Sequence, residues 1–255
     1  MRSNQRDSSS SVLGRAVQLL DTFDSDSVSL SLAELTSRSG LPKPTAHRLA
    51  GQLVELGLLE KGGTAYRLGL RLFELGSAVG RQRRLRDAAL PVMQDLYEAT
   101  HETIHLGILD GLEVLYIDKI TGRRSTAVAT RMGTRKPLHC TALGKAILSH
   151  SPPALLAAVI ENGLAKHSPY TITHPTRLRT ELANIADQGI AYDQEEYSLG
   201  VACVAAPVLD RHGGAQVAIS ITGPTARFNP ASRAAAVRMA SLSLARMLHG
   251  LPWPT

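Results

Sequence analysis

The stretch from Ser31 to Arg67 constrains the fold of this chain more than any other, because signals for two helices, a turn and a hairpin follow one another without a gap. Ser31 and Glu34 have the spacing of a capping box, in which each side chain satisfies a free backbone N–H at a helix start. Gly40 comes after a polar helix end and suits the left-handed conformation that closes a helix. The sequence therefore predicts a first short helix that ends before Gly40.

A second helix is predicted to begin near Pro44, because the missing N–H of proline costs nothing in the first turn of a helix. Apolar residues at spacings of three and four form a stripe that we expect to be buried: Ala46, Leu49, Leu53 and Leu56. Polar residues at the start of the helix then lie on or beside its solvent face: Lys43, Thr45, His47 and Arg48. Two helices joined by a short turn, the second with polar N-terminal residues, are typical of proteins that dock in the DNA major groove.

Two short apolar runs around Gly62 and Gly63 predict a β-hairpin directly after the second helix. With that hairpin as a wing, the region reads as a winged helix-turn-helix. Four wing side chains are then candidates to reach phosphates or the minor groove: Lys61, Thr64, Tyr66 and Arg67. The same pattern is also typical of a small packing unit, so by itself it leaves both interpretations open.

The positive charge of the chain is concentrated in its N-terminal third. The net charge is +6, and residues 1–86 hold 13 Lys/Arg and 8 Asp/Glu, a net of +5. This sign is expected for a protein that binds phosphate groups, although a charge of this size also serves solubility.

Several protein classes are disfavoured by composition. The two cysteines, Cys140 and Cys203, lack CxxC spacing and argue against a disulfide scaffold. No apolar run approaches the roughly 18 residues that a membrane helix needs, so no membrane partner is expected. The first 11 residues lack the apolar core of a signal peptide, which predicts a disordered lead-in and a cytoplasmic protein.

The remainder of the chain predicts an α+β protein. Residues 12–23 form a helical pattern with Leu13, Ala16, Val17 and Leu20 on one face, and residues 69–86 suit a linker helix that ends in an arginine cluster. From residue 87 onward, helices are expected at 88–100, 141–149, 153–162, 176–188 (capped by Thr176) and 230–249. Strands are expected at 104–111, 112–120, 123–131, 190–194, 203–209 and 216–222. Helices around a run of antiparallel strands are typical of an α+β sensor-like domain.

Several segments together resemble the IclR family of bacterial transcriptional regulators, in family order and spacing: SVLGRAVQLLDTF, LAELTSRSGLPKPTAHRLAGQLVELGLLE, YRLGLRLFELG, TIHLGILDGLEVLYIDKI, PLHCTALGKAIL, GIAYDQEEYSLGVACVAAPVLD and VAISITGP. The resemblance implies a winged helix-turn-helix domain at 12–68, a linker helix at 69–86 and a GAF-like effector-binding domain at 87–250. It further implies a homodimer or homotetramer that binds an operator in double-stranded DNA under the control of a small-molecule effector. No cofactor, metal or catalytic residue is implied.

The resemblance also places the effector pocket on particular residues of the C-terminal domain. Its expected wall consists of Val128, Ala142, Leu143, Asp193, Cys203, Ser220 and Thr222. Such a set brings a few polar groups together in an otherwise apolar cavity, which is the usual make-up of a small-molecule site. The family often governs the breakdown of aromatic acids, sugars and short carbon acids, so a catabolic metabolite is the expected effector. The effector's identity, the operator, the direction of regulation and the choice between dimer and tetramer stay open.

Two other functions remain as alternatives. The run from His101 to His105 (HETIH) matches the HExxH motif of zinc peptidases, which needs both histidines on one helical face. Here a predicted helix gives way to a strand, where the two positions lie roughly 13 Å apart. The other alternative is a small-molecule-binding module with an inactive DNA-binding head. Glu195 and Glu196 are interpreted as a solvated turn and not as an acid/base pair.

Overall fold

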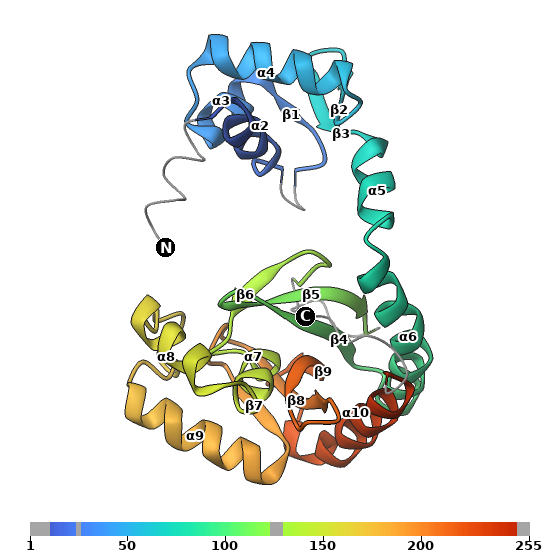
Figure 1. Cartoon of the computed structure of the whole chain (residues 1–255), viewed down its shortest axis with the longest axis vertical. Helices are drawn as coiled ribbons and strands as arrows, with labels where there is room; N and C mark the ends of the chain where they lie inside the picture. Colours follow the sequence, from blue (N-terminus) through green and yellow to red (C-terminus); the bar gives the residue numbers. More distant parts are fainter. Residues whose placement is uncertain (1–10, 24–26, 123–129, 249–255) are drawn as a thin grey trace. The chain divides into compact units, whose positions relative to one another are not determined.

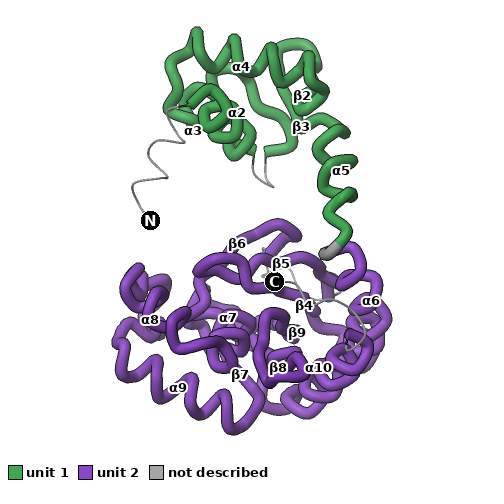
Figure 2. The backbone as a smooth tube through the Cα atoms, viewed as in Figure 1, with its two compact units in different colours: residues 1–80 green, residues 81–255 purple. Residues whose placement is uncertain are grey.

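The structure of the chain is a computed structural model that describes residues 11–23, 27–122 and 130–248. Our predictions for the N-terminal lead-in, for most of the strand at 123–131, for Val128 and for the end of the last helix lie outside these ranges. The chain divides into two units, residues 1–80 and 81–255 (Figures 1 and 2).

Unit 1 is a small helical domain with a three-stranded sheet. Its elements are α2 (Val12–Leu20), β1 (Leu30–Ser31), α3 (Leu32–Ser39), α4 (Lys43–Glu55), β2 (Leu59–Gly62), β3 (Ala65–Leu68) and α5 (Leu70–Ser77). The antiparallel sheet has the order β1-β3-β2, and β1 was not predicted. The helix-turn-helix and the wing are thus present in the predicted order.

The capping box and the glycine turns predicted for unit 1 are confirmed by the structure. Ser31 Oγ accepts from the backbone N–H of Glu34, and a Glu34 carboxylate oxygen accepts from the N–H of Ser31 at 2.8 Å. Gly40 closes α3 with φ of 67°, and Gly63 has φ of 60° in the turn of the wing. Each of these conformations is set within a few residues, so sequence spacing alone identified them.

Only part of the apolar face predicted for α2 packs against the core of unit 1. Leu13 and Val17 are exposed, whereas Leu19 is fully buried against α3 and α4 together with the half-buried Ala16 and Leu20. In α4 the predicted stripe is buried except for Leu56, which follows the last helical residue and is exposed. Periodicity identified both helices, but packing decided which side of α2 faces the core.

The predicted boundary between residues 86 and 87 lies inside a helix. α5 ends at Ser77, and α6 then runs from Gly80 to Thr100 with Pro91 in its interior, not in its first turn as predicted. A buried stripe that begins at Leu85 and continues through Ala89 packs the helix on the core of unit 2, and this packing extends it upstream of the expected start. Among the described residues, no helix is both long and apolar enough to cross a membrane.

Unit 2 is built on a six-stranded antiparallel sheet, which confirms the α+β class. Its strands are β4 (Thr103–Asp110), β5 (Glu113–Ile120), β6 (Arg135–Pro137), β7 (Ala191–Gln194), β8 (Val201–Leu209) and β9 (Ala215–Pro224), in the order β6-β5-β4-β9-β8-β7. β4 and β5 form the predicted hairpin, with Gly111 at φ of 63° in its turn. The short edge strand β6 lies where no strand was predicted.

Helices cover both faces of this sheet (Figure 1). They are α6, α7 (Ala142–Leu148), α8 (Pro153–Asn162), α9 (Pro175–Gln188), the 3₁₀ helix η1 (Pro230–Arg233) and α10 (Ala234–Leu248). One face packs its aliphatic side chains against α6 and α10, and the opposite face packs against α7 and α9. Thr176 does not cap α9, because the helix already begins at Pro175 with His174 as its N-cap residue.

Candidate effector cavity and nucleic-acid interface

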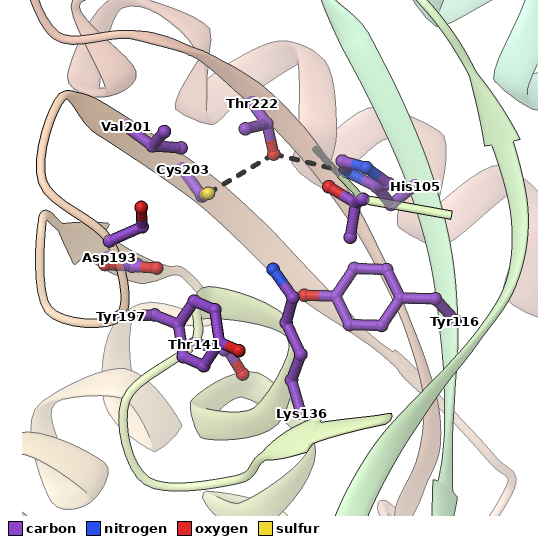
Figure 3. A pocket seen from close by; sticks show the side chains of 11 residues that line it. His105, Tyr116, Lys136, Thr141, Asp193, Tyr197, Val201, Cys203 and Thr222 are labelled. Atoms are coloured by element: carbon purple, nitrogen blue, oxygen red, sulfur yellow. Dashed lines mark hydrogen bonds between the residues drawn. The ribbon is translucent and has the colours of Figure 1, made fainter. Parts of the chain in front are cut away.

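Unit 2 contains a cavity of about 120 Å³ on the face of the sheet that carries α7 (Figure 3). Its lining comes from β4, β5, β6, β7, β8, β9 and the segments between them: His105, Tyr116, Thr130, Lys136, Thr141, Asp193, Tyr197, Ser198, Val201, Cys203 and Thr222. Most of the lining residues carry a polar group, and these groups include hydroxyl, thiol, imidazole, ammonium and carboxyl.

Strand register brings three predicted site residues together. Asp193 on β7 pairs with Cys203 on β8, which in turn pairs with Thr222 on β9. The Thr222 hydroxyl donates to the Cys203 sulfur at 3.2 Å and lies 3.3 Å from His105 Nδ1 (Figure 3). Because these strands are neighbours, residues 29 positions apart in sequence form one wall.

Among the described residues, three other predicted wall residues do not line this cavity. Ala142 and Leu143 belong to the packed apolar core around α7, and the preceding Thr141 lines the cavity in their place. Ser220 is buried on the same strand as Thr222 but is not among the lining residues, and Val128 lies outside the described residues.

Sequence reasoning missed several lining residues. His105 was interpreted only as part of a zinc motif. Because side chains alternate along β4, His105 points to the face of the sheet opposite to that of its neighbours Ile104 and Leu106, which is the face that carries the cavity. Lys136 and Tyr197 lie in short segments without periodicity, and no local signal predicts that they meet across the cavity.

Lys136 gives the cavity a positive charge. Its ammonium lies 4.2 Å from the centre of the Tyr197 ring and 5.4 Å from that of Tyr116, and Figure 3 shows the lysine between the two rings. Within the described residues, no carboxylate forms an ion pair with it, although the charge of Asp193 favours the ammonium form. Burial lowers the pKa of Lys136.

Two further titratable groups face the same space. Asp193 is 4% exposed, and its Oδ1 accepts from the backbone N–H of Glu196 at 2.8 Å. Burial raises the pKa of Asp193 to about 7, and the charge of Glu196 adds to the rise. Burial lowers the pKa of His105 to about 3, with help from the charges of Lys119 and Lys136, so this histidine is neutral at physiological pH.

A buried ion-pair cluster supports the wall that carries Asp193. Lys145 of α7 is fully buried and donates to Glu196 Oε1 at 2.5 Å and to Glu181 Oε1 of α9 at 3.0 Å. The prediction that Glu196 belongs to a solvated turn is therefore wrong, because its side chain is the buried partner of Lys145. The backbone C=O of Glu196 also accepts from Thr171 Oγ1 at 2.6 Å.

The HETIH run does not bring its histidines together. His101 follows the last residue of α6 and is exposed with φ of 54°, whereas His105 is buried within β4. The carboxylate of Glu102 between them is bound by the guanidinium of Arg227. No group of three or more His, Cys, Asp or Glu side chains is arranged to hold a metal ion in the part of the chain that the structure describes.

The candidate nucleic-acid interface is the start of α4 together with the wing of unit 1. Lys43, His47 and Arg48 are exposed at the beginning of α4, and Thr45 is half-buried. On the wing, Lys61, Thr64 and Arg67 are exposed. Arg48 donates to Gln52 Oε1 at 3.2 Å, and Arg67 pairs with Glu60 at 2.6 Å.

Tyr66 does not fit the predicted role on the wing. Its side chain is only 4% exposed and packs in the core of unit 1, with the Lys61 ammonium 5.7 Å from its ring centre. Alternation along β3 places Arg67 outward and Tyr66 inward.

Comparisons with known proteins agree with this architecture. A model of the IclR helix-turn-helix domain matches residues 12–63, and a model of the C-terminal domain of bacterial transcriptional regulator IclR matches residues 77–246. The chain is 35% identical over 240 residues to the HTH-type transcriptional regulator XynR of Escherichia coli K12, covering 92% of this chain and 95% of XynR. It is 30% identical over 220 residues to the transcriptional repressor IclR of the same organism, covering 84% and 80% of the two chains.

Solved structures give the same result. An IclR homolog from Microbacterium hydrocarbonoxydans, crystallised in complex with 4-hydroxybenzoate, matches with a TM-score of 0.85 and 29% identity over 94% of this chain and 100% of that chain. The IclR protein of Thermotoga maritima matches with a TM-score of 0.76 and 31% identity, covering 93% and 98% of the two chains.

Proposed function

Because the chain belongs to the IclR family of bacterial transcriptional regulators, we propose that a small organic acid in the cavity of unit 2 sets its affinity for an operator. The N-terminal unit carries the DNA-binding helix-turn-helix domain, and the C-terminal unit is the effector-binding domain. Binding in the cavity alters DNA affinity only if the acid prefers one of two arrangements of the protein, and such couplings are typically about 1–3 kcal/mol.

The observation that carries the choice of an acid is the Lys136 ammonium. It faces a cavity of about 120 Å³ and forms no ion pair with a carboxylate among the described residues. A buried cation without a carboxylate in direct contact is costly, and an anionic ligand that contacts it lowers that cost. The rings of Tyr116 and Tyr197 offer flat apolar surface beside the charge. The related Microbacterium protein was crystallised with 4-hydroxybenzoate, an acid of this type.

Lys136→Met is expected to weaken the binding of 4-hydroxybenzoate, or of a short-chain carboxylate, by about tenfold to one-hundredfold, because a hydrogen bond to a charged group contributes about 1.5–3 kcal/mol. Calorimetric titration of a panel of such acids measures the effect. Lys166→Met, which removes an exposed lysine that does not line the cavity, is the matched control. Equal affinities of Lys136→Met and the wild type would rule out Lys136 as the acid-binding group.

For DNA, we propose that Lys43, Thr45, His47 and Arg48 read or frame base edges while Lys61, Thr64 and Arg67 contact phosphates. All of these side chains are exposed on unit 1 except the half-buried Thr45. Two-fold pairing of subunits, as a homodimer or homotetramer, would match a pseudo-palindromic operator. We also propose that the protein works in the cytoplasm without a cofactor and has no catalytic activity.

Arg48→Ala is expected to weaken operator binding by about tenfold or more, since a base-contacting arginine contributes about 1–3 kcal/mol. The measurement is fluorescence anisotropy of full-length protein on DNA from its own upstream region, with nonspecific competitor and across a salt series. Arg179→Ala on α9 of unit 2 serves as the control for a lost surface charge. Unchanged affinity together with unchanged circular dichroism would remove Arg48 from the interface.

A further inference from the structure

An acidic residue, Asp193, lines the cavity that would receive a carboxylate effector. Asp193 and Lys136 both line it, yet no ion pair forms between these two described side chains. An effector carboxylate that approaches the Lys136 ammonium therefore also approaches the Asp193 carboxyl. Two carboxylates that share a buried site repel each other unless one of them is protonated.

We propose that effector binding takes up a proton, with Asp193 entering the complex as a neutral carboxylic acid that donates a hydrogen bond to the effector's carboxylate. Lys136 then supplies the countercharge. This inference rests on the proposed function, since it requires that the effector is an acid bound in this cavity.

The surroundings of Asp193 disfavour its ionised form. Lys145 is the cation of the buried ion-pair cluster described above. Its ammonium already donates hydrogen bonds to both Glu181 and Glu196. Glu196 is also the residue whose backbone N–H binds Asp193 Oδ1, so a second acidic side chain is fixed three positions away. Two carboxylates therefore already share the Lys145 ammonium, and its charge offsets only part of the rise in the pKa of Asp193 that burial causes. The pKa of Asp193 is about 7, so a substantial fraction is already protonated near neutral pH before any effector binds.

The neighbouring histidine and thiol groups that face Asp193 do not change their protonation state near neutral pH. The titratable groups that face Asp193 come from the turn after β7, from α7 and the residues before it, and from β4, β5, β6 and β8: Glu196, Tyr197, Lys145, Cys140, His105, Tyr116, Lys136 and Cys203. His105 is neutral because its pKa is about 3, and burial raises the pKa of the Cys140 thiol to about 12 and that of Cys203 further still. Burial also raises the pKa of Glu196, but this carboxylate is held in a direct ion pair with Lys145.

A zwitterionic ligand gives the opposite expectation. Its ammonium would pair with ionised Asp193 while its carboxylate paired with Lys136, so its affinity would rise with pH. The burial of Asp193 and its neighbour Glu196 both oppose the ionised form that such a ligand needs. With a pKa of about 7, the neutral carboxylic acid is already well populated near neutral pH, which favours a ligand that carries only a carboxylate over a zwitterion.

Calorimetry on the full-length protein tests the proposal. With benzoate and 4-hydroxybenzoate as probes, titrations from about pH 6 to about pH 8.5 in buffers of different ionisation enthalpy report affinity and proton uptake together. The affinity for benzoate is expected to be nearly constant below about pH 6.5. At higher pH it should fall, approaching about tenfold per pH unit, because one proton must bind with each effector. Near pH 8.5 close to one proton should be taken up per effector bound. The zwitterion 4-(aminomethyl)benzoate is expected to bind more weakly than benzoate throughout.

Asp193→Asn provides the decisive variant, because its amide keeps an oxygen for the Glu196 N–H and donates permanently, as the protonated acid does. It is expected to bind benzoate with no pH dependence over this range and at least about tenfold more tightly than the wild type near pH 8.5. Asp187→Asn, an exposed acid on α9, is the matched control and should keep the wild-type pH profile.

The outcomes separate the two proposals. Binding of the acids without proton uptake by the wild type, or an unchanged pH profile in Asp193→Asn, overturns the role of Asp193 and leaves the acid effector standing. Preferential binding of the zwitterion at high pH also overturns it. Failure of every acid to bind the wild type at any pH overturns both. Proton uptake by the wild type that is lost in Asp193→Asn assigns the proton to Asp193, whereas uptake that persists in the variant assigns it to Lys136, whose pKa burial also lowers, and overturns the role of Asp193.

Discussion

Replacing Lys145 with methionine is expected to lower the free energy of unfolding of unit 2 by about 3–5 kcal/mol, the cost of removing one partner from a buried ion pair. Lys145 is 0% exposed and is the partner of both Glu196 and Glu181. Methionine fills a similar volume, so the loss reports the charge left on buried Glu196. Urea denaturation followed by circular dichroism measures the change.

The double variant Lys145→Met, Glu196→Gln separates charge from packing. Because it removes the buried carboxylate as well, it is expected to recover a large part of the stability lost by Lys145→Met alone. Lys166→Met, at an exposed position, should change stability by less than about 0.5 kcal/mol. A Lys145→Met protein as stable as the wild type would mean that the cluster contributes nothing to the fold.

Gly144→Ala is expected to destabilise unit 2 by roughly 3 kcal/mol, at the upper end of the cost of overpacking. A Cβ at this position would lie 2.5 Å from Leu138 Cα, 2.6 Å from the Leu138 carbonyl oxygen and 2.7 Å from Thr141 Oγ1. Backbone atoms cannot move aside as a flexible side chain does, so the turn before α7 must shift. Thr141 lines the cavity, and acid binding should therefore weaken along with the melting temperature.

Gly51→Ala is the matched control and should act in the opposite direction. Gly51 lies within α4, is exposed, and a Cβ there would meet nothing within 4 Å. The added methyl restricts the unfolded chain and suits the helix, which should stabilise unit 1 by about 0.5–1 kcal/mol. If Gly144→Ala behaved like Gly51→Ala, the close packing around the start of α7 would be refuted.

The fold class could be predicted because most of its signals are local. The capping box of Ser31 and Glu34, the left-handed Gly40 and the hairpin turn at Gly111 each depend on a few adjacent residues. The candidate cavity was predicted only in part. Asp193, Cys203 and Thr222 were expected from the family resemblance, and antiparallel register aligns them across β7, β8 and β9.

The remaining features depend on contacts between residues far apart in the sequence. Whether Leu13 or Leu19 faces the core was decided by packing against α3 and α4. The burial of Glu196 required a lysine 51 positions earlier.

The sequence by itself therefore determined the order of the longer elements, the capping box of α3, the turns at Gly40 and Gly111, and the winged helix-turn-helix, because these follow from backbone geometry and spacing over a few residues. Only the tertiary structure decided that Lys136 lies between Tyr116 and Tyr197 and that Asp193 faces the same cavity. The charge state of such groups is set by burial and by neighbours distant in sequence, and neither exists until the sheet and α7 have packed.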